Sequence, residues 1–425
     1  AFTKLKPKTI QDVRRLTAVA GTSVELQMFV NKPLDSAILI PTKTIGGELP
    51  PPISLDFDSI DTLRFSTQIS LDATQRYRLE LTDEQNRTNR VPSVFTLNVT
   101  SNRPPSIKVV APGRDTDASP LEEVQLAAES WDDYGIEKLG VSYSIAGGES
   151  REFALQAVPI TSKSPSGSKK RKGKNWKRAD HLMPLESLNA QPDDLVSYYF
   201  WAEDGVAGGR MRRTSSDLYF VEVRRFEEIF RQGEAQPGQQ QQQQQQQQEQ
   251  QQGASAAKAE ELAKLQKLVM TGTWNLQRKQ SLLGGALPED PEEFAGDADV
   301  LTQAQATAIG QLDELAEELQ DPASRGMVES VRQAMGQSLV SLEAAVSANS
   351  YEPLPEALSG QQLAYQGLLR MRAKESEVAM QQQQQSQSQS QSQSQSSRQQ
   401  QQLDQLNVDE DRNRYEEEKS AREEV

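Results

Sequence analysis

The chain has no cysteine and only one histidine, His181. The absence of cysteine excludes disulfides, thiolate nucleophiles, zinc–thiolate centres and iron–sulfur ligation. A single imidazole excludes any mechanism or metal site that needs two histidines from one chain. Serine–histidine–aspartate orders and glycine-rich phosphate loops are also missing, so the sequence predicts a protein that is not an enzyme and has no organic cofactor.

Long apolar runs are missing as well. No stretch approaches the roughly 18 consecutive apolar residues that a membrane-spanning helix needs. The net charge of −15 argues against nucleic acid as a partner, because phosphates would be repelled by most of the surface. The chain starts without a methionine or a signal-peptide core and stops inside a charged helical pattern, so we expect it to be a segment of a longer protein.

Two successive stretches have the alternation of β-strands. Residues 1–102 and residues 103–230 each contain several short apolar runs that Gly, Pro, Asn and Asp interrupt, in the same order both times. This pattern predicts two tandem immunoglobulin-like β-sandwiches. The segment SNRPPS lies between them and predicts an extended, stiff connection.

Beyond residue 253 the apolar period changes to that of helices. Leucine, alanine and valine recur at helical spacing in four stretches of residues 254–380, which predicts an α-helical bundle. Three other segments have compositions that do not favour a packed core. They are a Gln-rich linker at 231–253, a Gln/Ser linker at 381–402, and the start of a charged helix or coiled coil at 403–425.

The stretch WDDYG contains two adjacent aspartates, Asp132 and Asp133. Adjacent strand residues point to opposite faces, so the two cannot converge on one substrate atom as a glycosidase pair must. One interpretation is a turn, in which the carboxylates bond nearby N–H groups and Gly135 adopts a positive φ. A second interpretation is a calcium site between the sandwiches, formed by Asp132, Asp133, Glu203 and Asp204.

A basic stretch is predicted to form a long exposed loop at residues 161–178. Either it is a solvated insertion, or it contacts an anionic membrane surface or an anionic polymer. The residues that would make this contact are Lys169, Lys170, Arg171, Lys172, Lys174, Lys177 and Arg178.

Three further features have structural interpretations beside functional ones. We expect His181 to be a structural residue at a strand edge rather than a catalytic one. We expect Trp274 to pack inside the helical bundle, with a partner-binding groove as the alternative. The aromatic residues that could form a glycan platform are Trp131, Tyr134, Tyr198, Tyr199 and Trp201, although alternation along the strand must place one set in the core.

The chain resembles a bacterial family known as domain of unknown function 4175. The resemblance rests on residues 13–39, 128–149, 198–205 and 217–232, and on the Gln-rich separators. It implies a large envelope protein with membrane helices before this segment and a Gln-rich, coiled-coil C-terminal half, and it implies no catalytic residues.

Three functions are therefore considered. The first is a non-enzymatic periplasmic scaffold of an anchored envelope protein, with other envelope proteins as partners and possible homo-oligomers through the coiled coil. The second is a β-sandwich that binds glycan or another envelope polymer. The third is an assembly or chaperone-like adaptor that acts through the helical segment.

Overall fold

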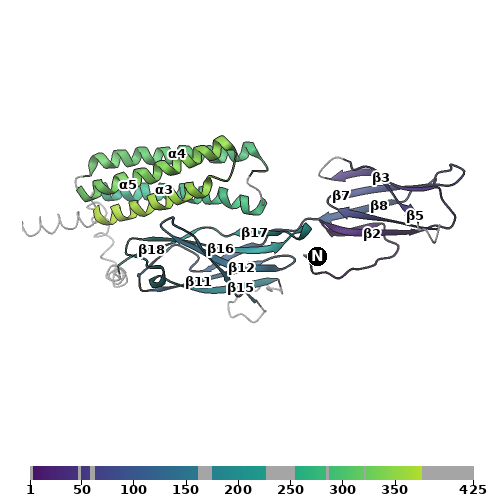
Figure 1. Cartoon of the computed structure of the whole chain (residues 1–425), viewed down its shortest axis with the longest axis horizontal. Coiled ribbons are helices and arrows are strands. Elements are labelled where there is room, and N and C mark those ends of the chain that lie inside the picture. The colour runs from purple at the N-terminus through teal and green to yellow at the C-terminus, as the bar shows by residue number, and fades with distance from the viewer. Residues whose placement is uncertain are drawn as a thin grey trace, which may run out of the picture. The chain divides into compact units, whose positions relative to one another are not determined.

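The computed structural model describes residues 3–45, 49–57, 63–160, 175–225, 254–283, 287–319 and 322–375. Their N-terminal part consists of β-sheets and their C-terminal part of four helices, as the change of period predicts (Figure 1). The contacts divide the chain into two units. Unit 1 is Ala1–Ile229, Thr271–Ala298 and Ala344–Pro355, and unit 2 is Phe230–Met270, Asp299–Glu343 and Glu356–Val425.

The first β region belongs to unit 1 and contains two sheets. Its strands are β1 (Arg15–Val19), β2 (Thr22–Phe29), β3 (Ser36–Ile45), β4 (Ile53–Ser54), β5 (Asp56–Phe57), β6 (Arg64–Leu71), β7 (Thr74–Thr82) and β8 (Val94–Thr100). One sheet has the order β1-β8-β7-β3-β4, with β1 parallel to β8, and the other has the order β2-β6-β5. Leu39 and Tyr77 from the first sheet and Phe65 and Leu71 from the second share one buried core.

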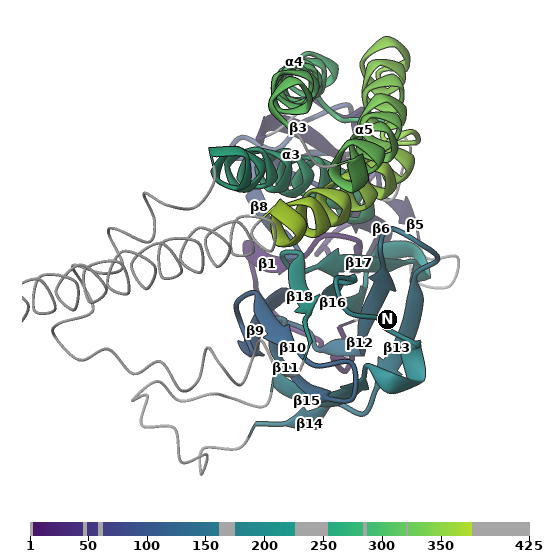
Figure 2. The ribbon, with the colours of Figure 1, turned by 90° about the vertical axis from the view of Figure 1, so that its left-hand side faces the viewer.

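The second β region also belongs to unit 1. Its strands are β9 (Ser106–Ala111), β10 (Thr116–Ala118), β11 (Glu123–Trp131), β12 (Ile136–Ile145), β13 (Arg151–Leu155), β14 (Val158–Pro159), β15 (Trp176–Pro184), β16 (Leu195–Gly205), β17 (Met211–Ser215) and β18 (Tyr219–Val223). One sheet has the order β14-β15-β11-β9, and the other has the order β10-β18-β16-β12-β13, with β17 also paired to β16. Figure 2 shows these two layers end on.

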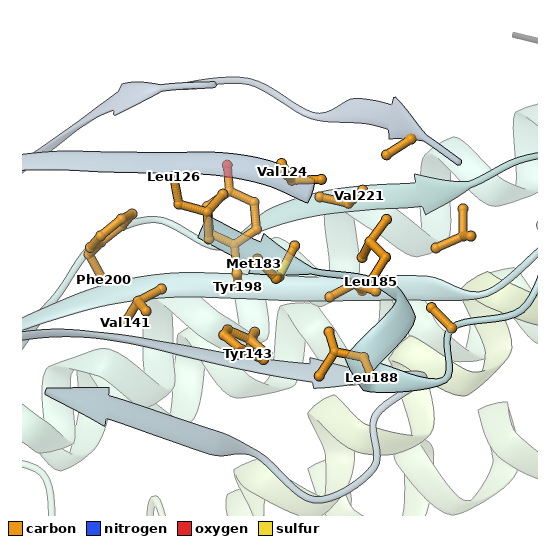
Figure 3. Close-up of a cluster of buried hydrophobic side chains, with 14 of the residues drawn as sticks. Val124, Leu126, Val141, Tyr143, Met183, Leu185, Leu188, Tyr198, Phe200 and Val221 are labelled. Carbon is orange, nitrogen blue, oxygen red and sulfur yellow. The ribbon is translucent and has the colours of Figure 1, made fainter. Parts of the chain in front are cut away.

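The core of the second β region lies between its two layers. Leu126 and Met183 enter it from one sheet, and Val141, Tyr198 and Phe200 enter it from the other (Figure 3). All five side chains are fully buried. In β15 the core residue Met183 is flanked by less buried residues, as expected for a strand with one covered face. In contrast, β12 and β16 are largely buried on both faces.

The two β regions repeat one order of strands. In each region one short strand near the start pairs in parallel with the last strand. These pairs are β1–β8 and β10–β18. In each region the next strand along the chain belongs to the second sheet, where it pairs antiparallel with a later strand. These pairs are β2–β6 and β11–β15. One difference concerns the outer edge, because β9 pairs with β11, whereas no strand among the described residues pairs with the outer edge of β2.

Four helices follow the β regions. They are α3 (Ala254–Leu283), α4 (Pro291–Glu318), α5 (Pro322–Ala348) and a helix at residues 354–375. Pro291 and Pro322 each occupy the first helical position, where the missing N–H has no intrahelical partner to lose. None of the described helices has an apolar stretch long enough to cross a membrane.

Unit 2 has a partly polar interior. The Gln266 and Gln305 side chains are fully buried and exchange two amide hydrogen bonds of 3.1 Å. Ser255 Oγ also donates to Glu375 Oε2 at 2.6 Å. Because each partner of the glutamine pair satisfies the other, replacing one alone would leave a buried amide without its bonds. The pair therefore favours one register of α3 against α4.

Candidate functional site

The WDDYG stretch forms a turn between β11 and β12. The Asp132 carboxylate is 1% exposed, and its Oδ2 accepts hydrogen bonds from the backbone N–H groups of Tyr134 at 2.8 Å and Gly135 at 2.6 Å. Gly135 has a φ of 107°, which disfavours residues with a side chain. The structure thus confirms the turn interpretation of this stretch.

The surroundings of Asp132 make its carboxylate easier to protonate. Burial raises the pKa of Asp132, and the nearby charges of Asp204 and Asp133 raise it further, although the two backbone N–H donors oppose this shift. Oδ1 of Asp132 is buried without a hydrogen-bond partner. Asp133 contacts the connection between the β regions instead, because its Oδ2 accepts from the Arg103 N–H at 3.4 Å.

Asp204, at the end of β16, is the centre of a network that holds this connection. Its carboxylate is 1% exposed and accepts two bonds from Arg212, Nη2 to Oδ2 at 2.6 Å and Nε to Oδ1 at 3.1 Å. Asn102 Nδ2 donates to Asp204 Oδ2 at 3.0 Å and to the Gly205 carbonyl at 3.1 Å. The Arg212 guanidinium also donates to the carbonyls of Asn102 at 3.1 Å and Arg103 at 2.7 Å.

Glu203 belongs to a different network. Arg213 donates to Glu203 Oε1 through Nε at 3.1 Å and Nη2 at 2.9 Å, and Lys138 Nζ lies 3.3 Å from Oε2. The Arg213 guanidinium also lies 4.1 Å from the centre of the Trp201 ring. Glu203 and Asp204 are neighbours in one strand, so their side chains leave opposite faces of the sheet.

The expected calcium site of Asp132, Asp133, Glu203 and Asp204 is therefore corrected by the geometry. The four carboxylates have separate partners: Asp132 bonds its own turn, Asp133 accepts from the Arg103 N–H, Asp204 pairs with Arg212 and Glu203 pairs with Arg213. Within the part of the chain that the structure describes, no group of three or more acidic or histidine residues could hold a metal ion. Strand alternation separates Glu203 from Asp204 in β16, whereas Asp132 and Asp133 lie in the turn after β11.

The basic stretch falls largely outside the described residues. Lys169, Lys170, Arg171, Lys172 and Lys174 are among the residues not described, so contact with an anionic surface remains a prediction for them. The predicted loop 161–178 extends too far, because Trp176, Lys177 and Arg178 belong to β15. Lys177 Nζ donates to the Ile136 carbonyl at 2.7 Å and Arg178 pairs with Asp180 at 2.7 Å, and these bonds let charged residues lie in a strand.

His181 lies in β15 opposite Leu126 of β11. Its ring packs against Phe153 and Tyr143, with ring centres 5.5 Å and 5.9 Å away. Nε2 is buried without a hydrogen-bond partner, and burial lowers the pKa of His181. This packing between aromatic rings supports a structural role.

We expect the imidazole of His181 to titrate below the value of about 6.5 for a solvated histidine. The unfolded chain then binds more protons than the folded chain between the two pKa values, so unfolding becomes easier as the pH falls through about 6.5. Because the chain has one histidine, its Hε1 proton gives one resolvable NMR titration. His181→Phe should weaken the loss of stability between pH 7 and 5, and a native midpoint at or above 6.5 would contradict this expectation.

The aromatic residues of the possible glycan platform are mostly covered. Tyr198 and Phe200 are fully buried in the core of the second β region. On the other face Trp201 is 3% exposed, and it lies so close to Gly140 that a Cβ there would be 2.3 Å from the indole ring. Trp131 and Tyr134 are half-buried at the turn, and Tyr199 is half-buried in β16. The arrangement therefore offers no open aromatic surface along β16.

Trp274 of α3 covers Tyr199, the remaining aromatic residue of that face. Their ring centres are 4.4 Å apart, and Trp274 Nε1 donates to the Ser216 carbonyl at 3.0 Å. Arg278, one turn later, pairs with Asp217 at 2.5 Å. The expectation that Trp274 packs inside the helical bundle is thus wrong: helical spacing identifies a buried stripe but not the surface that buries it.

Sequence reasoning missed two residues of the junction, Asn102 and Arg212. One signal was present, because Glu203-Asp204 is followed after a short Gly-rich stretch by Arg212-Arg213. Antiparallel pairing of β16 with β17 places Asp204 opposite Arg212 and Glu203 opposite Arg213. A sequence-based prediction of a hairpin between β16 and β17 would therefore have placed each carboxylate opposite its arginine.

Comparisons with known proteins give weak similarities. No protein-family model and no curated protein matches the chain. Trypsin-activated α2-macroglobulin from Escherichia coli is 11% identical over 50% of this chain, with a TM-score of 0.18, and the chain spans only 15% of that protein. A bacterial ice-binding adhesin is 12% identical over 49% of this chain and 61% of its own, with a TM-score of 0.29.

A third solved structure comprises two immunoglobulin domains. The first two immunoglobulin domains of DIP-gamma are 13% identical over 49% of this chain and 93% of theirs, with a TM-score of 0.21. Similarities of this size carry no inference about what the chain binds or where it acts. The chain is therefore characterised by its own geometry, in which a buried ion pair holds the connection between two β regions of like topology.

Proposed function

We propose that the chain is a non-enzymatic scaffold in which two tandem immunoglobulin-like β-sandwiches form a stiff spacer that carries a helical segment. The sheet order supports the immunoglobulin-like assignment. In the second β region β9, β11, β15 and β14 correspond to strands A, B, E and D of that fold, and β12, β16 and β18 correspond to C, F and G. The first β region repeats this plan without strand A.

The observation that carries the proposal is the fixed connection between the β regions. A tandem pair with a solvated linker would bend freely, because interfaces between domains of one chain are ordinarily small. Here the Arg212 guanidinium bonds the carbonyls of Asn102 and Arg103 while it is held by Asp204. The Asn102 side chain also donates a hydrogen bond to the Asp204 carboxylate.

Two additional contacts limit bending at the same place. Lys4 Nζ pairs with Glu137 Oε1 at 2.6 Å, between the start of the chain and the second β region. Gly21, in the turn between β1 and β2, lies so close to Ala207 that an added Cβ would be 2.4 Å from the Ala207 Cβ. The connection also contains two prolines, at positions 104 and 105, which restrict its backbone further.

The proposed setting is the periplasmic side of a bacterial cell envelope, with membrane helices outside residues 1–425. This setting rests on the resemblance to the domain of unknown function 4175 family. Other envelope proteins are the proposed partners, since a spacer with a helical segment holds binding surfaces at a defined separation. The aromatic contacts of β16 with Arg213 and Trp274 give no support to a glycan-binding alternative.

A distance measurement across the junction tests the proposal. The chain has no native cysteine, so Asp72→Cys in the first β region and Leu121→Cys in the second can be spin-labelled selectively. Both positions are exposed. We expect a narrow distance distribution by double electron–electron resonance in the full chain. Arg212→Gln should broaden it, because the connection then loses its bonds to the guanidinium.

The neighbouring pair provides a matched control. Arg213→Gln removes an arginine of the same strand, but Arg213 bonds Glu203 and Glu152 and does not contact the connection. Its distance distribution should stay narrow. A broad distribution in the unsubstituted chain, or equal broadening by the two variants, would show that the Arg212 network does not stiffen the pair.

A further inference from the structure

The outer edge of β2 is open in a place where the second β region is closed. β11 pairs with β15 on one side and with β9 on the other. β2 is the counterpart of β11, and in the described residues it pairs only with β6. An edge strand presents unpaired N–H and C=O groups that can accept another strand.

The side chains under this edge are incompletely covered. Val24, Leu26 and Met28 point inward from β2, yet all three remain only half-buried beside the core of the first β region. Their counterparts in β11 are Val124, Leu126 and Ala128, whose exposures are 7%, 0% and 0%. A strand added beside β2 would therefore bury apolar surface as well as form a ladder of hydrogen bonds.

Apart from the single charge of Glu25, β2 lacks the features by which exposed edges usually avoid association. Its sequence TSVELQMF contains no proline and no lysine. Its pairing with β6 runs without a bulge from Thr22 opposite Leu71 to Phe29 opposite Arg64. Phe29, at the end of the strand, is 69% exposed. Proline, lysine and bulges are the common protections of an edge, so β2 is a candidate pairing surface.

The preceding segment of the same chain does not cover the edge. In the second β region the covering strand β9 precedes β10 by a few residues. The corresponding residues 3–14 of the first β region form no strand. Pro7 lies in their middle, and Leu5 and Ile10 are 68% and 47% exposed. A strand that closes this edge must therefore come from elsewhere.

The ladder geometry restricts how a second β2 could pair. The Val30 N–H donates to the Leu63 carbonyl, which continues the β2–β6 register by one pair of residues. Backbone groups alternate in direction along a strand, so the even-numbered residues of β2 direct their N–H and C=O groups toward β6. Odd-numbered residues then direct theirs outward. An antiparallel pair that joins these groups places odd opposite odd, and it keeps Val24, Leu26 and Met28 on the core side.

Among such registers, charge favours the one that is centred on Leu26. Centring the pair on Glu25 would place two carboxylates opposite each other, which is destabilising. Centring it on Leu26 places Glu25 of each copy opposite Gln27 of the other and Val24 opposite Met28. The Gln27 amide already donates to Glu25 Oε1 within one strand at 2.6 Å, so the two groups are a compatible donor and acceptor.

We infer that a second copy of this chain docks at β2, with the two β2 strands antiparallel about Leu26 and the β2-β6-β5 sheets of both copies joined into one. Two eight-residue strands bury less than the roughly 1,200 Å² of stable complexes. Association is therefore expected at about 0.1–1 mM, and it would become significant where copies are held close together. This surface is separate from the Arg212 junction.

Sedimentation equilibrium of the full chain over about 10 μM to 1 mM tests the inference, with circular dichroism to confirm that each variant is folded. Gln27→Lys places a cation opposite Glu25 twice in the dimer and should tighten it by about two- to thirty-fold. Gln27→Glu places two carboxylate pairs in contact and should weaken it by a similar factor. The double variant Glu25→Lys with Gln27→Glu should again associate more tightly than the unsubstituted chain.

The opposite signs separate this surface from any other route to a dimer. Association through the glutamine tracts or the helices would not respond in opposite directions to Lys and Glu at position 27. A chain that stays monomeric to about 1 mM in both the unsubstituted and Gln27→Lys forms overturns the inference. A dimer with the same affinity in all variants overturns it too, while neither result changes the junction measurement.

Discussion

Replacing Asp204 by alanine should lower the free energy of unfolding by about 3 kcal/mol. The carboxylate is 1% exposed and holds the Arg212 guanidinium, whose side chain is 17% exposed, by two hydrogen bonds. Removing one member of a buried ion pair leaves the other charge without its counterion, and this is more costly than the net value of the pair. Asn102 would lose an acceptor at the same time.

Denaturant unfolding of the full chain measures this loss. Asp180→Ala is the matched control, because Asp180 also pairs with an arginine, but both partners are about as exposed as ordinary surface residues at 39% and 47%. Its cost should stay below about 0.5 kcal/mol. Equal costs for the two alanine variants would mean that solvent screens the Asp204 pair and that it does not hold the junction.

The β-strands could be predicted from the sequence because each strand has one face in a core. Val124 and Leu126 alternate with the exposed residues Glu123 and Gln125 in β11, and this alternation follows directly from burial on one side. The alternation is interrupted at Ala127, which is also buried. The four helices could also be predicted, because the spacing of apolar residues changes from every second residue to about every 3.6 residues, whatever surface the helices pack against. Both spacings are properties of a short stretch of sequence, so they can be recognised without a structure.

The junction could not be predicted in full because its partners are distant in the sequence. Asn102 and Asp204 are separated by 102 positions, and no periodicity links them. The calcium interpretation placed Asp132 and Asp204 together near the junction, but Asp132 bonds the N–H groups of its own turn and Asp204 pairs with Arg212 on the neighbouring strand. A buried carboxylate needs a counter-charge or a hydrogen-bond donor, and here Arg212 supplies what a cation would have supplied.

Buried polar residues of the helices escaped prediction for another reason. Gln266 and Gln305 lie at helical spacing from the buried residues Leu262 and Ala308, but their polar side chains are typical of the solvent side of a helix. In the structure each satisfies the other within the interior. Pairing of this kind depends on two helices at once and leaves no trace in either helix alone.

Replacing Trp274 by alanine should cost about 3–5 kcal/mol of stability, the range for removing a buried tryptophan. The indole is 5% exposed, packs on Tyr199 and donates to the Ser216 carbonyl. Trp274→Phe should cost less, since a smaller ring still contacts Tyr199 and mainly the N–H donor is lost. Leu268→Ala, at a position of α3 that is 71% exposed, should change stability little.

A double-mutant cycle decides which surface buries Trp274. If the indole packs on β16, the costs of Trp274→Ala and Tyr199→Ala in denaturant unfolding should fall short of additivity by about 1 kcal/mol, because each substitution removes the same ring contact. A tryptophan buried only among helices would not contact Tyr199, and the two costs would then add. Additivity within about 0.3 kcal/mol would therefore return Trp274 to the bundle interior and remove the attachment of α3 to the second β region.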